Sequence, residues 1–235
     1  MILIISAVFP PEPVVAASLA KDLAESMAQN YKIMVITPKP TRPFGFSFSG
    51  SYSSVQKFEH IVLDSYTYPK SRMLGRLRES FSFGMHSSRL IKINRDEIQS
   101  CYVSAWPLIG QYLIIRTLKK FSIPSVLHIQ DIYPESVCNK IPFLGDLIRL
   151  ILLPLDTYIL NHSSKVVAIS NNMRDTFIRT RRIPEHKIKI VYNWKDEEEF
   201  IKDDHRKVSD WAKKIKGEPF IFMYRGNIGP CGVCD

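Results

Sequence analysis

The stretch ILIISAVFPPEP (residues 2–13) decides the fold of this chain. Its first four residues, Ile2–Ile5, form a continuous apolar run, which is typical of a β-strand buried on both faces of a sheet. Pro10 and Pro11 then form a stiff turn, and a helical pattern begins near Val14. A strand that leads through a turn into a helix is the opening unit of a parallel α/β sheet.

Similar apolar runs return along the chain, separated by helical patterns. The runs lie at 33–36, 61–63, 101–103, 126–129, 166–169, 188–191 and 220–223. Helical spacing of apolar residues occurs at 16–27, 109–120 and 144–158. This alternation predicts an α/β fold with a Rossmann-like, doubly wound parallel sheet. We expect Pro154 to kink or divide the last helix, because proline lacks an amide donor, and we expect a long irregular loop around one strand at 37–68.

The composition excludes several classes of protein. With 235 residues, 45% of them hydrophobic, the chain can bury a sizeable core, which excludes a disordered or fibrous protein. The longest wholly apolar run, 150–155, is far shorter than the roughly 18 to 20 residues of a membrane-spanning helix. The four cysteines are scattered and the N-terminus has no secretory signature. We therefore expect reduced thiols and a cytoplasmic location.

Length and charge runs predict one full domain and part of another. We expect an N-terminal domain over residues 1–200, a charged linker helix at 201–219, and the first strand and loop of an otherwise missing domain at 220–235. The chain would then be truncated, either as a frameshifted or as a prematurely ended reading frame. Cys231-Gly232-Val233-Cys234 has the form of a redox or half-zinc site, but its place at the end of the chain favours coincidence.

Three polar residues of catalytic type follow the run at 126–129. They are His128, Asp131 and Glu135, and in a doubly wound sheet the exit of a strand is where a ligand site forms. The alternative is that His128 is a core residue. A metal is not expected, because no third ligand of suitable spacing accompanies His128 and Asp131.

Other strand exits carry weaker signals. Pro11 and Glu12 follow the first strand, but no glycine-rich dinucleotide or phosphate-binding motif is present, which argues against an oxidoreductase or P-loop enzyme. Ser170 or Asn171 is placed to cap a helix, and capping alone explains either residue. Trp194 is either a ligand contact or simple packing.

Residues 70–95 form a basic, amphipathic stretch with aromatic residues. The formal net charge of +9 permits an anionic partner, and this stretch concentrates the positive charge. Such a pattern suits an anionic membrane surface or a lipid phosphate, whereas a solvated helix that packs on the domain is the alternative. Nucleic acid is a poorer choice, because no binding motif accompanies the charge. The surface residues expected here are Arg72, Arg76, Arg78, Phe81, Phe83 and Arg89.

Five short motifs together resemble bacterial family 4 glycosyltransferases, especially those of O-antigen and capsule synthesis of the N-acetyl-fucosamine transferase type. In chain order they are FPPE (9–12), HIQDIYPES (128–136), ISNNM (169–173), VYNW (191–194) and GNIG (226–229). The resemblance implies the N-terminal half of a GT-B fold. It also implies transfer of a sugar from a nucleotide sugar to a polyprenyl-diphosphate-linked or glycan acceptor, with retention of configuration and without an essential metal or other cofactor.

The resemblance also implies roles for particular residues. His128 would lie near the transferred sugar, and Asp131 and Glu135 would orient the acceptor or assist its hydroxyl, while the leaving phosphate takes the acceptor's proton. The basic stretch would face the inner side of the cytoplasmic membrane as a peripheral surface. The substrate-binding set is Pro11, Glu12, Ser170, Asn171, Asn193, Trp194, Arg225, Gly226 and Asn227.

The chain departs from the family pattern at two places. Val14 and Val15 stand where many members have glycines, which weakens close phosphate approach at that loop, and the chain ends before the glutamate pair of the donor-binding domain. We therefore expect little or no transferase activity from this chain alone. The alternative is a noncatalytic acceptor-binding module or half of a split GT-B enzyme that needs a separate donor-binding subunit.

Overall fold

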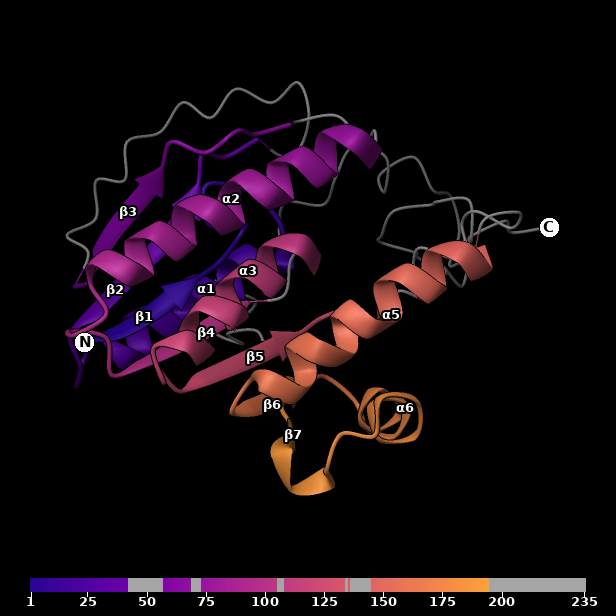
Figure 1. Ribbon diagram of the computed structural model, residues 1–235. Coiled ribbons are helices and arrows are strands. Elements are labelled where there is room, and N and C mark those ends of the chain that lie inside the picture. The colour runs from indigo at the N-terminus through magenta and orange to yellow at the C-terminus, as the bar shows by residue number, and fades with distance from the viewer. Residues whose placement is uncertain (42–56, 69–72, 105–107, 134, 136–144, 195–235) are drawn as a thin grey trace, which may run out of the picture. The chain divides into compact units, whose positions relative to one another are not determined.

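The computed structural model describes residues 1–41, 57–68, 73–104, 108–133, 135 and 145–194 (Figure 1). Within them, seven strands form one sheet in the order β3-β2-β1-β4-β5-β6-β7, and all six neighbouring pairs are parallel. The strands are β1 (Ile2–Ile5), β2 (Ile33–Pro38), β3 (Glu59–Leu63), β4 (Ser100–Ser104), β5 (Ser125–Ile129), β6 (Lys165–Ala168) and β7 (Ile188–Ile190). The predicted doubly wound parallel sheet is confirmed. The eighth predicted strand, 220–223, lies outside the described residues.

Helices cover both faces of the sheet. They are α1 (Val15–Met27), α2 (Met73–Ile93), α3 (Leu108–Lys120), α5 (Gly145–His162) and α6 (Asn171–Arg181), with a short 3₁₀ turn, η1 (Glu185–Lys187). Helices α2, α3 and α5 lie in a row across one face (Figure 1). Because successive side chains of a strand point to opposite faces, Leu3 and Ile5 join the core beneath these helices, whereas Ile4 joins a second core beneath α1.

Two glycines let α2 and α3 approach closely. A Cβ atom added at Gly84 would lie 2.7 Å from the Cα atom of Gly110, and one added at Gly110 would lie 2.9 Å from the carbonyl oxygen of Ser80. Both distances are shorter than real Cβ contacts. The Ser80 hydroxyl also accepts a hydrogen bond from the Gly110 amide at 2.8 Å. The crossing of the two helices therefore depends on residues without side chains.

Helix α5 contains Pro154 but is not divided by it. The helix runs from Gly145 to His162, so of the two expected effects of Pro154, a kink or a division, the division does not occur. Packing of Ile159 and Leu160 into the core, where both side chains are fully buried, anchors the part of the helix that follows the proline.

The chain divides into two compact units, Met1–Asn193 and Trp194–Asp235. The sheet and its helices belong to the first unit. All but Trp194 of the second unit lies outside the described residues, as do the predicted linker helix and the predicted beginning of a second domain. Cys231, Cys234 and residues 42–56 of the loop predicted at 37–68 also lie outside the described residues.

Candidate functional site

The order of the strands places the candidate site at one edge of the sheet. The chain winds from β1 through β2 to β3 on one side and from β4 to β7 on the other, so the winding reverses between β1 and β4. Ligands of such sheets bind outside the carboxyl ends of the strands near this reversal. Because all strands are parallel, the segments that leave β1, β5, β6 and β7 emerge at this edge. Most of the predicted site residues within the described ranges lie on these segments.

His128 is the centre of a hydrogen-bond chain at this edge. It lies in β5 with 3% of its surface exposed. Its Nδ1 bonds the Tyr102 hydroxyl of β4, and its Nε2 lies 2.9 Å from the amide nitrogen of Gln130. Asn193, which follows β7, donates from Nδ2 to Gln130 Oε1 at 3.0 Å. We call Tyr102, His128, Gln130 and Asn193 the His128 chain.

The His128 chain has a defined direction of donation. Asn193 donates to the Gln130 carbonyl oxygen, so the amide nitrogen of Gln130 faces His128. An amide nitrogen can only donate, so Nε2 of His128 accepts and the ring proton lies on Nδ1. Nδ1 then donates to the Tyr102 oxygen, and the Tyr102 proton stays available for another acceptor. The four residues therefore hold a neutral imidazole in one tautomer.

Burial keeps His128 neutral. It lowers the pKa of His128 to about 4 and raises the pKa of Tyr102. A histidine with so low a pKa carries no proton to donate as an acid at neutral pH. The chemistry that the arrangement offers is therefore orientation and hydrogen bonding to a polar ligand, with Tyr102 as donor, rather than acid catalysis by His128.

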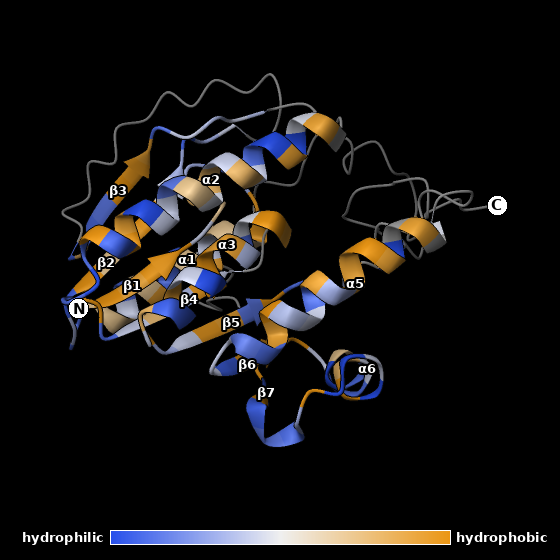
Figure 2. Cartoon of the chain, viewed as in Figure 1, coloured by the Kyte–Doolittle hydropathy of each residue, from blue (hydrophilic) through white to orange (hydrophobic). Residues whose placement is uncertain are grey.

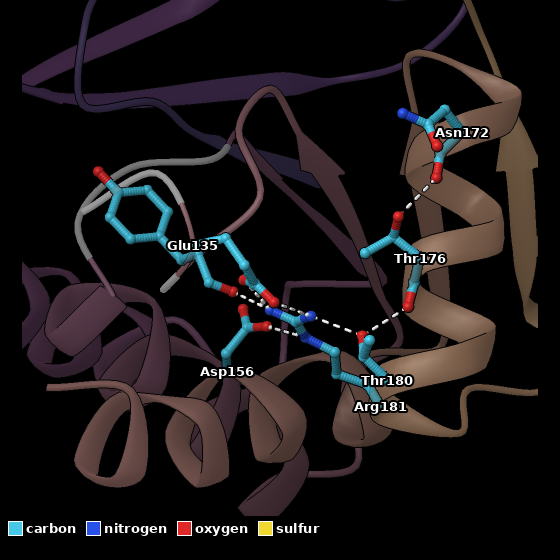
Figure 3. Close-up of polar contacts among 7 residues, drawn as sticks. Glu135, Asp156, Asn172, Thr176, Thr180 and Arg181 are labelled. Atoms are coloured by element: carbon cyan, nitrogen blue, oxygen red, sulfur yellow. Dashed lines mark hydrogen bonds and ion pairs between the residues drawn. The ribbon is translucent and has the colours of Figure 1, made fainter. Parts of the chain in front are cut away.

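Glu135 belongs to a cluster around Arg181 (Figure 3). Both of its carboxylate oxygens accept from the Arg181 guanidinium, at 2.7 and 2.6 Å, and Arg181 also donates to Asp156 at 2.9 Å. The same guanidinium donates to the Thr180 hydroxyl and to the Tyr133 carbonyl. We call Tyr133, Glu135, Asp156, Thr180 and Arg181 the Arg181 cluster.

The Arg181 cluster is buried and charged. Arg181 is 2% exposed and Asp156 is 5% exposed. Burial raises the pKa of Asp156 to about 6, although Arg181 acts in the opposite direction. Burial acts to raise the pKa of Glu135 too, but hydrogen bonds from Arg181 and its charge outweigh it, so the pKa of Glu135 is lowered. Glu135 therefore holds the segment after β5 to α5 and α6, instead of acting beside His128.

The remaining predicted residues are placed as follows. Asp131 is exposed. Glu12 is buried, and its carboxylate accepts from the Thr41 amide at 2.8 Å, so it ties the loop after β1 to the segment after β2. Ser170 caps α6 by accepting from the Met173 amide at 3.2 Å, as the capping alternative requires. Pro11 lies in the loop after β1, and Asn171 donates to the Tyr192 hydroxyl at 3.4 Å.

Trp194 is 36% exposed. Arg225, Gly226 and Asn227 lie outside the described residues.

The residues predicted to form a membrane surface separate into two groups. Arg78 and Phe81 are exposed on α2, and Arg89 is exposed one turn before its end. Phe83 is only 6% exposed and belongs to the core, so the prediction that it faces a membrane is wrong. Its place on the helix, opposite Phe81, is the physical reason. Arg76 is paired with Glu79 at 2.8 Å, and Arg72 lies outside the described residues.

Sequence reasoning missed Tyr102, Gln130 and Arg181. Gln130 offered a signal, because it lies two residues after His128, where strand geometry returns a side chain to the same face. Tyr102 and Arg181 offered none, since only the pairing of β4 with β5 and the docking of α6 bring them to His128 and Glu135. Among the described residues, no group of three potential metal ligands lies together, and no helix has the length and apolar character needed to cross a membrane.

The fold and the polar strand exits define a class: Rossmann-like domains that bind ligands at the carboxyl edge of a parallel sheet. The chain belongs to Glycosyltransferase Family 4, whose family model matches residues 14–199. No curated protein sequence matches it. The chain is similar in structure to Alr3699/HepE of Anabaena in complex with UDP and glucose, with a TM-score of 0.53 and 16% identity over 84% of this chain and 45% of that one.

The same Anabaena protein in complex with UDP alone gives a TM-score of 0.51 with the same identity and coverage. The chain thus spans a little under half the length of these structures. The expected fold class is confirmed: the chain is a Rossmann-like α/β domain, and it matches about 45% of the length of these structures.

Proposed function

We propose that this chain is the acceptor-binding half of a glycosyltransferase that takes a sugar from a nucleotide sugar. The observation that carries the proposal is the family match over residues 14–199, which covers six of the seven described strands, β2 to β7, and the segments that follow them. The complexes of Alr3699/HepE with UDP and with UDP-glucose support a nucleotide-sugar donor. The sugar transferred is proposed to be a hexose or an N-acetylhexosamine.

The acceptor is proposed to be a polyprenyl-diphosphate-linked sugar or a glycan in O-antigen or capsule synthesis. Exposed apolar residues on α2 support a membrane-facing surface: Leu74 is 78% exposed and Phe81 is 52% exposed, and Arg78 lies between them. An amphipathic helix of this kind attaches to the inner face of the cytoplasmic membrane without spanning it. Such attachment weakens as salt rises, because salt screens the basic residues.

The residues of the site are proposed to act by positioning. The neutral His128 and the Tyr102 hydroxyl form a polar wall that orients a sugar hydroxyl, while the exposed Asp131 orients the acceptor. Retention is proposed to follow a front-face route: the bond from the anomeric carbon to the leaving phosphate breaks, the acceptor oxygen bonds that carbon from the same face, and the phosphate takes the acceptor's proton. This route requires neither a protein nucleophile nor a metal.

The test uses two proteins. The 235-residue chain alone is expected to give no measurable transfer from a nucleotide sugar, and turnover by the purified chain would contradict the proposal that it is an acceptor-binding half. In a longer protein that includes a nucleotide-sugar domain, we expect transfer to a polyprenyl-diphosphate-linked sugar that survives EDTA. NMR of the product's anomeric proton should show the donor's configuration, and inversion would contradict retention.

Substitution of His128 tests the site in that longer protein. His128→Ala is expected to lower kcat/KM. The matched control is Asn172→Ala, at an exposed position of α6. An unchanged kcat/KM would remove His128 from the mechanism. Binding of the acceptor without transfer by either protein would instead favour a noncatalytic acceptor-binding module.

A further inference from the structure

A groove of about 420 Å³ lies between the C-terminal halves of α2 and α3. Its volume is in the range of small-molecule sites, which is about 300 to 1,000 Å³. It is lined by Met85, His86, Ser88, Arg89, Lys92, Thr117, Lys120 and Phe121. None of these residues belongs to the His128 chain or to the Arg181 cluster.

The crossing of the two helices explains why the groove opens where it does. Gly84 and Gly110 bring α2 and α3 into backbone contact at one level. Toward the C-terminal end of each helix the residues become long, with Arg89 and Lys92 on α2 and Lys120 on α3. The space between these side chains is the groove.

The lining of the groove suits an anion that carries an apolar part. Arg89, Lys92 and Lys120 are basic, and no acidic residue is among the lining residues. Met85 and Phe121 contribute apolar surface at the same place. The hydroxyl oxygen of Ser88, another lining residue, is buried and has no hydrogen-bond partner in the described part of the chain.

The groove continues an apolar stripe on the exposed face of α2. Leu74, Leu77, Phe81 and Met85 are 78%, 40%, 52% and 48% exposed, at spacings of three and four residues that keep them on one face of a helix. The next positions on this face, one and two turns on, are Arg89 and Lys92. Figure 2 shows orange and blue segments along the whole of α2, as expected of a helix that carries both apolar and charged residues.

Exposed apolar residues and basic residues on one face of a helix suit a helix that lies in the plane of a membrane surface. The apolar side chains enter the boundary of the acyl chains, and basic side chains stay at the level of the phosphates. Each Lys or Arg near an anionic bilayer contributes about 1 kcal/mol of attraction. A lipid phosphate bound in the groove would thus meet three cations while its acyl chains lie along Met85 and Phe81.

We propose that this groove binds the phosphate head group of an anionic phospholipid, at a site separate from the sugar-binding edge. Helices of a parallel α/β sheet run opposite to the strands, and α2 ends at Ile93 shortly before β4 begins at Ser100. The groove therefore lies toward the amino edge of the sheet, away from His128. The inference rests on the proposed membrane attachment of α2 and adds to it the lipid class and the residues that select it.

The experiment measures binding of the 235-residue chain to vesicles. Phosphatidylcholine vesicles with and without phosphatidylglycerol are compared at about 0.1 M salt, where the Debye length is about 10 Å. We expect binding that requires phosphatidylglycerol. Arg89→Gln combined with Lys120→Gln is expected to weaken it about fivefold for each charge removed, or roughly 25-fold in all.

The matched control is Lys57→Gln combined with Lys189→Gln. These two exposed lysines lie outside the groove, beside β3 and in β7, and their loss changes the net charge by the same amount. We expect less than a twofold change from the control. Circular dichroism melting of both variants checks that folding is unchanged.

Three outcomes would overturn the proposal: vesicle binding that does not need phosphatidylglycerol, an equal loss in both double variants, or sn-glycerol 3-phosphate binding at Arg89 and Lys120 without vesicle binding. The last outcome would identify a site for a free phosphate. The vesicles contain neither a nucleotide sugar nor a lipid-linked sugar, so this result does not depend on transferase activity. Conversely, the absence of transfer in the longer protein would leave the vesicle result standing.

Discussion

The His128 chain and the Arg181 cluster each contain a residue that was predicted to be catalytic. Hydrogen bonds between neutral groups hold the first together, whereas ion pairs hold the second. The His128 chain consists of neutral groups whose hydrogen bonds set one tautomer of a buried imidazole. At the centre of the Arg181 cluster, one guanidinium pairs with two carboxylates. Arg181 and Asp156 are almost wholly buried. The comparison teaches that a polar residue at a strand exit is equally suited to a site and to a structural ion pair, and that its partner distinguishes the two.

The largest expected effect is the removal of Arg181. Arg181→Met leaves Asp156 and Glu135 without their counter-charge, and breaking a buried ion pair costs about 3 to 5 kcal/mol. Urea unfolding at pH 7, followed by circular dichroism, measures the loss. Arg179→Met, at an exposed position of the same helix, is the control, with an expected change within about 0.5 kcal/mol.

A triple variant tests why the loss of Arg181 lowers the free energy of unfolding. If the cost arises from unpaired carboxylates, then Arg181→Met combined with Asp156→Leu and Glu135→Gln should recover most of the stability, since buried ion pairs are often replaceable by apolar groups. No recovery would show that packing around Arg181, rather than charge, is what the cluster supplies.

The next effect comes from protonation of His128. Its pKa is about 4 in the folded chain and about 6.5 when unfolded, so the unfolded chain binds the proton first as the pH falls. The contribution of His128 to stability is therefore complete above pH 6.5 and is lost between about pH 6.5 and 4, at up to about 1.4 kcal/mol per pH unit. Unfolding free energies measured across this range should show a flatter pH dependence for His128→Gln.

The opposite sign is expected from Asp156 in the Arg181 cluster. The pKa of Asp156 is raised to about 6 by burial, so the folded chain takes up that proton before the unfolded chain does. Asp156→Asn should therefore make the loss of stability on acidification steeper, whereas His128→Gln makes it shallower. The same slope in both variants would contradict this difference between the two regions.

A smaller effect is expected when the donor to His128 is removed. Gln130→Ala leaves Nε2 of a buried imidazole without its hydrogen bond, at a cost of about 1 to 3 kcal/mol. Loss of that donor also makes protonation of Nε2 easier, so the pKa of His128 should rise. A ¹⁵N NMR titration of the imidazole measures the shift, and an unchanged pKa would show that Gln130 does not bond His128 in solution.

The smallest effect is expected at Asn193. Asn193→Ala removes one exposed hydrogen bond to Gln130, worth about 0.5 to 1.5 kcal/mol. Gln130 can then turn its carbonyl oxygen toward His128, which moves the ring proton to Nε2. The ¹⁵N shifts of His128 should change from those of one tautomer to a mixture, while Asn172→Ala should leave them unchanged. Retention of the single tautomer in Asn193→Ala would show that Gln130 alone fixes it.

Local patterns were sufficient for the elements of the fold but not for the partners of the site. The apolar runs predicted each of the seven strands, because strands buried on both faces need side chains of one kind throughout. The same patterns predicted that Ser170 caps a helix, since capping depends on residues three positions apart. Pro154 does not divide α5, which was one of its two expected effects, because packing of the following residues outweighs the local cost of proline.

The sequence by itself determined that this chain forms a parallel α/β sheet, and its five motifs indicated the glycosyltransferase family, because hydrophobic period and short motifs are local properties. Only the tertiary structure decided that His128 meets Tyr102 and Gln130, and that Glu135 meets Arg181, 46 residues away. The physical reason is that charges and hydrogen bonds act over a few ångströms in space. Which residues come within that distance is fixed by strand pairing and helix packing.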